Sequence, residues 1–251
     1  MTGDAAKTAI VTGANRGIGR AIALRLARDG FQVVLCARDQ KLLEEAVREI
    51  ESGGGSASSV ALDLRLPESP ARLAENALQA FGRIDVVVNN AGATKRGDFE
   101  RLTDEEWADG FALKFFGAVR LTRAAWPELK KQAGSVVNIS GVGGRTPGPQ
   151  FTIGGSVNAA LLSFTKALAD LGVRDGVQVN AINPGAVRTE RLVRRLAADA
   201  ATAEDLVRTA NITRIGETGD IAGLVSFVVG PDGRWLQGSL IDMDGGQTKT
   251  V

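Results

Sequence analysis

Seven short, strongly apolar runs recur along the chain and alternate with longer amphipathic segments. The runs cover residues 7–12, 31–37, 58–64, 83–90, 134–140, 177–183 and 239–245. They are nearly continuous in β-branched and aliphatic residues and show no strict alternation with polar ones. Such runs are typical of strands in a parallel sheet that is covered on both faces.

The segments between the runs have helical periodicity. In residues 19–30, Ile22, Ala23 and Leu26 fall on one face of a helix that ends at a glycine. Segments 39–55, 70–82 and 103–131 repeat the pattern, and the last opens on a capping threonine, Thr103. Strands and helices alternate along the whole chain, so we expect a single α/β domain over residues 1–251, a doubly wound Rossmann-type sheet of about seven parallel strands.

Residues 187–216 break the regular alternation. Their pattern is helical, but they are polar and rich in arginine, and they lie between the last two predicted strands. They can form a pair of solvated helices. Alternatively they form a lid over a ligand, because long insertions at the carboxyl edge of such sheets often serve binding.

A glycine-rich stretch, TGANRGIG (12–19), follows the first predicted strand and opens the first helix. Glycines in this context permit a tight turn and close packing, and they let a pyrophosphate sit on the helix N-terminus. The sequence therefore predicts a dinucleotide site.

The residues after the second predicted strand bear on the choice of dinucleotide. NAD sites usually carry an acid there that binds the ribose hydroxyls, but here the strand ends in Ala37 and Arg38. Asp39 comes one residue too late, and Arg16 in the glycine loop adds a second guanidinium. We therefore expect NADP(H) to be preferred over NAD(H), with both arginines near the additional phosphate.

The composition of the chain limits the partners it can bind and the residues that can transfer protons. The net charge of +1 gives no bulk attraction to nucleic acid or to a membrane, the single cysteine rules out an internal disulfide, and no cluster suggests a metal site. No signal peptide or membrane-spanning run is apparent, so we expect a cytoplasmic protein. The chain has no histidine and no tyrosine, so any proton transfer falls to Lys, Asp, Glu, Cys, the substrate or water.

Several motifs occur together in order: TGANRGIG, ALDL at 61–64, NNAG at 89–92, NPGAVRT at 183–189 and LIDMDGG at 240–246. With them the chain resembles the short-chain dehydrogenase/reductase family. The resemblance implies a small carbonyl or alcohol substrate and a homodimer or homotetramer. The glycine motif and the resemblance together assign cofactor contacts to Gly13, Asn15, Arg16, Gly17, Ile18, Gly19, Arg38, Asp63, Leu64, Asn90, Ala91, Gly92, Pro184, Gly185, Val187 and Thr189.

The family's reductases use an Asn on the fourth helix, a Ser after the fifth strand, and a Tyr and a Lys four residues apart. In the same register this chain has Lys114 at the Asn position, Gly141 at the Ser position with Ser140 beside it, Gly154 at the Tyr position and Asn158 at the Lys position. The usual reduction therefore needs a rebuilt proton relay.

Lys114, Ser140 and Asn158 are the candidate catalytic residues. Lys114 is either a lysine that extends along a helix edge to solvent or an ammonium near the substrate carbonyl, with a pKa lowered by burial. Ser140, Asn158 and Thr152 can donate hydrogen bonds to an oxyanion or to the ribose, or they can simply pack and cap.

Three functions remain open from the sequence: an NADP(H)-dependent oxidoreductase with a non-standard site, which we place first, a non-redox lyase or isomerase, and a catalytically silent cofactor-binding sensor or partner subunit. Residues Thr94, Arg96 and Gln150 with the 187–216 segment suggest a polar or acidic substrate.

Overall fold

The computed structural model describes residues 6–249, so the termini of the predicted 1–251 domain lie outside the described residues. Its strands are β1 (Thr8–Thr12), β2 (Gln32–Ala37), β3 (Ser56–Ala61), β4 (Val86–Asn89), β5 (Ser135–Ile139), β6 (Gln178–Pro184) and β7 (Leu240–Met243). They form a seven-stranded sheet in the order β3-β2-β1-β4-β5-β6-β7, and every neighbouring pair is parallel. The predicted Rossmann-type sheet is confirmed.

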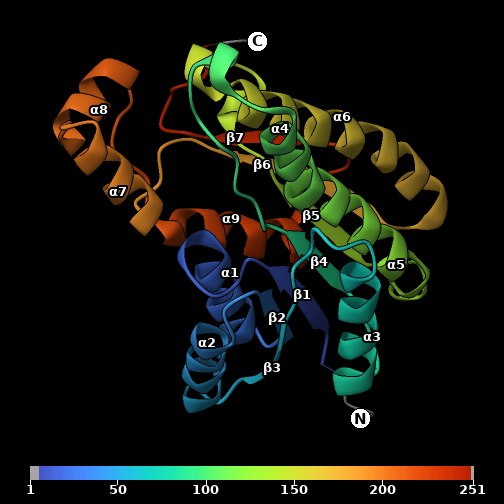
Figure 1. Cartoon of the computed structure of the whole chain (residues 1–251). Coiled ribbons are helices and arrows are strands. Elements are labelled where there is room, and N and C mark those ends of the chain that lie inside the picture. The colour runs from blue at the N-terminus through green and yellow to red at the C-terminus, as the bar shows by residue number, and fades with distance from the viewer. Residues whose placement is uncertain (1–5, 250–251) are drawn as a thin grey trace.

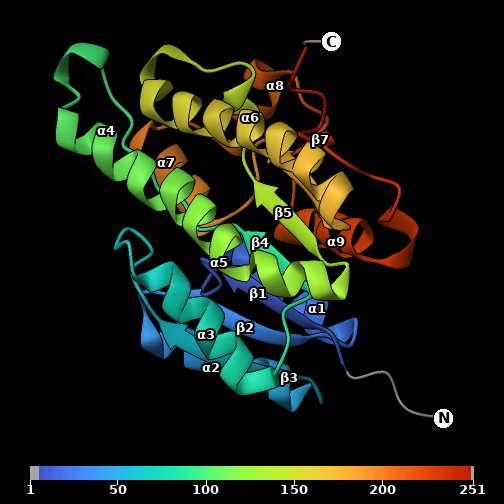
Figure 2. The same ribbon diagram turned by 90° about the vertical axis from the view of Figure 1, so that its right-hand side faces the viewer.

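Helices cover both faces of this sheet. One layer contains α1 (Gly17–Arg28), α2 (Gln40–Ser52) and α9 (Thr218–Val229), and the other contains α3 (Ser69–Phe81), α5 (Gly117–Gln132) and α6 (Thr152–Asp175). Figures 1 and 2 show the sheet between these two layers. The strands β1, β4, β5 and β6 are buried along their whole length, which explains why they need no solvent-facing polar side, whereas the edge strands β3 and β7 are partly exposed.

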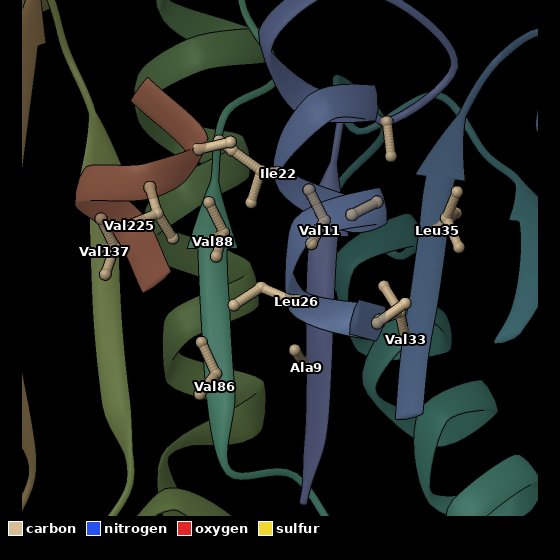
Figure 3. Packing of buried hydrophobic residues seen from close by; sticks show 14 of the residues in the cluster. Ala9, Val11, Ile22, Leu26, Val33, Leu35, Val86, Val88, Val137 and Val225 are labelled. Atoms are coloured by element: carbon tan, nitrogen blue, oxygen red, sulfur yellow. The ribbon is translucent and has the colours of Figure 1, made fainter. Parts of the chain in front are cut away.

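The core beneath α1 illustrates this packing. Ile22 and Leu26 of α1 point onto the sheet beside Val11 and Val88, and Val225 of α9 lies next to them (Figure 3). All five side chains are fully buried. The predicted face of the first helix is therefore the face that packs on the sheet.

Two predicted elements differ most from the structure, and the strand predicted at 83–90 is shorter, since β4 covers Val86–Asn89. The third strand spans Ser56–Ala61 and not 58–64, because the chain leaves the sheet at Leu62, and residues 62–64 form the start of a loop. The predicted helix 103–131 is divided into α4 (Asp104–Gly110), a π-helical segment (Phe111–Phe116) and α5. Its threonine cap is confirmed, since the Thr103 and Glu106 side chains cap each other's backbone.

The 187–216 segment contains two short helices, α7 (Glu190–Ala198) and α8 (Ala203–Ala210), which project beyond α1 at one end of the molecule (Figure 1). An isolated bridge between Val187 and Gly216 closes the base of this segment. No helix within residues 6–249 is both long and apolar enough to cross a bilayer.

Candidate functional site

The predicted cofactor residues come from separate loops that meet at the carboxyl edge of the sheet. They follow β1, β2, β3, β4 and β6, and the order of the strands reverses between β1 and β4, where ligands of such sheets bind. Thr12 joins two of these loops, since its hydroxyl accepts hydrogen bonds from the N–H groups of Asn90 (2.9 Å) and Ala91 (3.0 Å). In return the Asn90 amide donates to the Thr12 carbonyl at 2.9 Å.

Gly13 and Gly19 of the glycine loop are packed too closely for a side chain. A Cβ on Gly19 would lie 2.2 Å from the Gly13 carbonyl oxygen and 2.4 Å from the Asn90 amide nitrogen. The N-terminus of α1 has no side-chain cap and no acidic residue in its first turn. Its free N–H groups and its dipole are therefore available to an anion, which fits the predicted pyrophosphate.

The end of β2 fits a phosphorylated ribose better than a bare one. The Arg38 guanidinium lies 3.8 Å from the Asp63 carboxylate, and its side chain is 68% exposed, so it is free to turn toward a phosphate. The Asp39 carboxylate instead caps α2 by accepting from the N–H of Leu42 at 3.1 Å. The acid that follows β2 most closely in sequence, Asp39, is thus engaged in capping a helix.

The other predicted phosphate ligand, Arg16, lies 3.6 Å from Glu190 at the start of α7, and both side chains are well exposed. Thr189, a predicted cofactor contact, caps α7 through its hydroxyl, and its methyl group lies 3.5 Å from where a Cβ on Gly17 would be. The base of α7 therefore adjoins the glycine loop.

Lys114 lies at the centre of the predicted catalytic residues. Its ammonium nitrogen donates to the Asn158 side-chain oxygen at 2.6 Å and to the Ser140 carbonyl oxygen at 2.7 Å. The π-helical segment carries the lysine and is held against α6 by an edge-on contact of Phe115 with Phe164, 6.1 Å between ring centroids. The stem of the lysine packs on Gly92, where a Cβ would lie 2.9 Å from its Cδ atom.

The surroundings of Lys114 change its acidity. Burial disfavours its charged form, and the guanidinium of Arg191 repels it, so the pKa falls from 10.5 to about 7. At neutral pH this lysine is therefore present in both protonation states. The structure supports an inward-facing ammonium over a lysine that extends to solvent.

Ser140 and Thr152 differ from what their hydroxyl groups suggested. The Ser140 hydroxyl donates to the Asn158 carbonyl at 3.1 Å, so the serine joins the site through its own carbonyl, which accepts from Lys114. The Thr152 hydroxyl oxygen is buried without a hydrogen-bond partner among the described residues. Of the predicted polar set, Lys114 and Asn158 are the side chains that bond to each other directly.

The Gly154 position is filled by a neighbour. A Cβ there would lie 2.1 Å from two ring carbons of Phe151, so the aromatic ring occupies the space into which a side chain at 154 would extend. The same ring lies 2.8 Å from where a Cβ on Gly143 would be, and the Arg96 guanidinium stacks over it at 4.4 Å. The helix turn at residues 154–158, which has no ionisable side chain, is thus closely packed in the structure.

Sequence analysis missed two residues of this site, Phe151 and Arg191. Arg191 reaches from α7 to donate to the Gly92 carbonyl at 2.7 Å, which places its charge next to Lys114. The arginine-rich run was noted, but its spacing from Thr189 could not say which arginine turns inward. For Phe151 the available signal was an aromatic residue immediately before a small-residue helix turn.

A family model described as short chain dehydrogenase matches residues 7–200. The chain belongs to the short-chain dehydrogenase family. A curated family member, an uncharacterized oxidoreductase of Mycobacterium tuberculosis, is 37% identical over 244 residues, which cover 96% of this chain and 92% of the relative.

Solved structures of this family share the whole fold. L-sorbose reductase from Gluconobacter frateurii, complexed with NADPH and L-sorbose, superposes with a TM-score of 0.92 at 30% identity over 99% of both chains. An NADPH-bound short chain oxidoreductase from Pseudomonas aeruginosa, described as containing an atypical catalytic center, has a TM-score of 0.91 at 28% identity, covering 99% of this chain and all of the other. The fold is therefore shared with relatives whose structures contain bound NADPH.

Proposed function

We propose that this protein is an NADP(H)-dependent oxidoreductase that interconverts a small carbonyl compound and its alcohol, with Lys114 as the group that moves the proton. The observation that carries the proposal is the pair of short hydrogen bonds from Lys114 to Asn158 and Ser140, beside the predicted cofactor loops. Membership of a dehydrogenase family and relatives solved with NADPH support the cofactor and the reaction class.

The geometry explains how one lysine can act as both acid and base. An ammonium has three N–H donors, and two of them bind the Asn158 and Ser140 oxygens. A neutral amine keeps two donors, so both hydrogen bonds survive deprotonation. The third position then alternates between an N–H and a lone pair, and a pKa of about 7 makes both forms accessible at neutral pH.

The resemblance places an Asn at position 114 and a Lys at position 158, and this chain has the two residue types exchanged. The exchange keeps an ammonium and an amide in contact, with the charge now on the π-helical segment and not on α6. We propose that this pair, with no tyrosine in the chain, makes up a non-standard catalytic site.

In the proposed reduction, bound NADPH supplies the hydride to the carbonyl carbon. The third N–H of Lys114 donates its proton to the carbonyl oxygen as that oxygen gains charge, and the alcohol leaves with that proton. Asn158 and the Ser140 carbonyl hold the nitrogen in place during the transfer. The amine then recovers a proton from solvent, so one NADPH and one proton are consumed for each alcohol formed.

The glycine loop, the exposed guanidiniums of Arg16 and Arg38, and the loops after β4 and β6 would hold the cofactor. We further propose that residues 187–216 form a lid, because α7 contacts both the glycine loop through Glu190 and the loop after β4 through Arg191.

The test is NADPH oxidation over a panel of ketones, aldehydes and oxo acids, for wild type, Lys114→Met and a control, Lys166→Met, which removes an exposed lysine from α6. We expect Lys114→Met to lower kcat/KM about a hundred- to ten-thousand-fold, since general acid catalysis contributes that much, and the control to keep full rate. Equal turnover by wild type and Lys114→Met would refute the assigned role. Substrate conversion without NADPH oxidation would favour a lyase or isomerase, and tight NADPH binding without turnover would favour a silent binding protein.

A further inference from the structure

Helix α7 carries two arginines on the face that adjoins the predicted site. Arg191 and Arg195 are four residues apart and therefore lie on the same face of the helix. Burial lowers the pKa of Lys114 most, and the charge of the neighbouring Arg191 lowers it further. Burial is likewise the larger cause of the lowered pKa of Arg96, to which the charge of Arg195 adds. Each of the two α7 arginines is thus near one cation of the predicted site.

Arg96 is attached to the catalytic residues through Phe151. Its guanidinium stacks over the Phe151 ring at 4.4 Å, and that ring packs on Gly154, one helix turn from Asn158. The N–H of Gly97 donates to the Gln150 carbonyl at 3.1 Å, which fixes the loop carrying Arg96 beside Phe151. One turn of helix rises ~6 Å, and the four residues from Gly92 to Arg96 span at most ~14 Å. The backbone at Arg96 therefore lies no more than ~14 Å from that of Gly92, on which the Lys114 stem packs.

Arg96 is an exposed cation that has no anionic partner of its own in this group. Arg96 makes no ion pair within residues 6–249, and the carboxylate that partly offsets its charge, Asp199, lies beyond ion-pairing distance. Arg191 adjoins Arg16, which we assign to the cofactor phosphates. Neither Arg96 nor Arg195 is among the predicted cofactor contacts, so this pair is left for a different anion. With Asp199 beside it the pair has a net charge of about +1, which matches a carboxylate better than a doubly charged phosphate.

We propose that Arg96 and Arg195 form a subsite for a carboxylate group of the substrate, with the Phe151 ring as the platform that holds Arg96 in place. The inference rests on the proposed function, because it makes the substrate an oxo acid or hydroxy acid whose reacting carbon lies at Lys114. It narrows the substrate class from a small carbonyl compound to a carbonyl compound that carries a carboxylate a few bonds away.

The kinetic experiment compares oxo acids with their uncharged methyl esters, using pyruvate, acetoacetate and levulinate. Wild type, Arg96→Met, Arg195→Met and a control are assayed for NADPH-dependent reduction, the control being Arg72→Met, which removes an exposed arginine from α3. We expect at least one acid to be reduced with a kcat/KM about tenfold or more above that of its ester, and Arg96→Met and Arg195→Met each to lower that ratio about tenfold. An ester reduced as well as its acid, or a ratio unchanged in both variants, would overturn the proposal.

A binding experiment separates this proposal from the reaction itself. Titration calorimetry of the same acids into the complex with NADP⁺ detects the carboxylate subsite even if no hydride is transferred. We expect measurable binding that weakens about tenfold in Arg96→Met and not in Arg72→Met. Binding without turnover would refute the proposed function and keep the subsite. No binding of any of the acids, or equal binding by wild type and Arg96→Met, would refute the subsite. Inorganic phosphate binding more tightly than the acids would also overturn the choice of a carboxylate.

Discussion

Lys114 should release its proton near pH 7 and not near 10.5, because its ammonium is buried against Ser140 and Asn158 and lies beside Arg191. With such a pKa about half of the molecules carry the amine at pH 7 and about nine-tenths at pH 8, whereas an ordinary lysine is more than ~99% protonated at both values. Arg191→Gln removes the repelling charge, so we expect it to raise the pKa of Lys114, although burial, the larger cause, remains.

The assay is an NMR titration of the lysine side-chain carbons, with the Lys114 signal assigned by its absence from Lys114→Met. It needs no substrate. When a substrate is known, kcat/KM for reduction should fall about tenfold per pH unit above ~7, because reduction uses the protonated form, and oxidation should rise through the same range. A Lys114 midpoint near 10.5, or a reduction profile that is flat from about pH 6 to 9, would refute the assignment of Lys114 as the proton donor.

The same pKa also predicts how stability depends on pH. The unfolded chain keeps the lysine proton up to about pH 10.5, and the folded chain releases it near 7. Between these values the unfolded state binds more protons, so this residue makes the free energy of unfolding rise with pH. Lys114→Met should remove that slope in urea denaturation measured across the window. A slope that is identical in wild type and variant would contradict the lowered pKa.

Three further predictions concern other parts of the molecule. Gly154→Ala should lower the free energy of unfolding by about 1–2 kcal/mol in urea denaturation, because the overlap of the new Cβ with the Phe151 ring costs more than the gain in helix propensity. Adding Phe151→Ala should remove that overlap. Equal stability of Gly154→Ala and wild type would show that the ring moves freely. Arg38→Ala should weaken NADPH binding about tenfold or more and leave NADH binding unchanged in fluorescence titration, and parallel losses for both cofactors would argue against a contact with the additional phosphate. Asp85→Ala should lower the free energy of unfolding by about 3 kcal/mol, because the buried Asp85 carboxylate accepts from the Thr8 N–H at 2.8 Å and pairs with the partly buried Arg83. A loss below about 1 kcal/mol would show that water takes the place of the carboxylate.

Most of the fold could be predicted from the sequence because one repeating pattern carries it. Apolar runs predicted every strand of the described sheet, and helical periodicity predicted the packed face of α1. The errors occurred where the local sequence pattern did not determine which secondary structure forms. Residues 62–64 include two leucines that suit a strand but leave the sheet, and nothing in the FALKFF segment distinguishes a π-helix from an α-helix.

The candidate site was predicted less completely, for a physical reason. A motif fixes which loops reach the carboxyl edge of the sheet, so the glycine loop and the NNAG and NPGAVRT segments were placed correctly there. It does not fix side-chain directions across loops that are far apart in sequence. The contact of Arg191 with Gly92 joins residues 99 positions apart, and nothing local in either segment indicates it. The cofactor contacts, the catalytic roles, the cytoplasmic location and the homodimer or homotetramer remain predictions.

The contact between Gly154 and Phe151 has a consequence for how this site can change over generations. A larger residue at 154 overlaps the ring, and removal of the ring leaves a hole beside a glycine, so each substitution alone is expected to be unfavourable. Only a chain that carries both changes regains a well-packed turn. No single substitution that adds a side chain at position 154 is therefore expected to be favourable. Residues 151 and 154 should instead change together among close relatives.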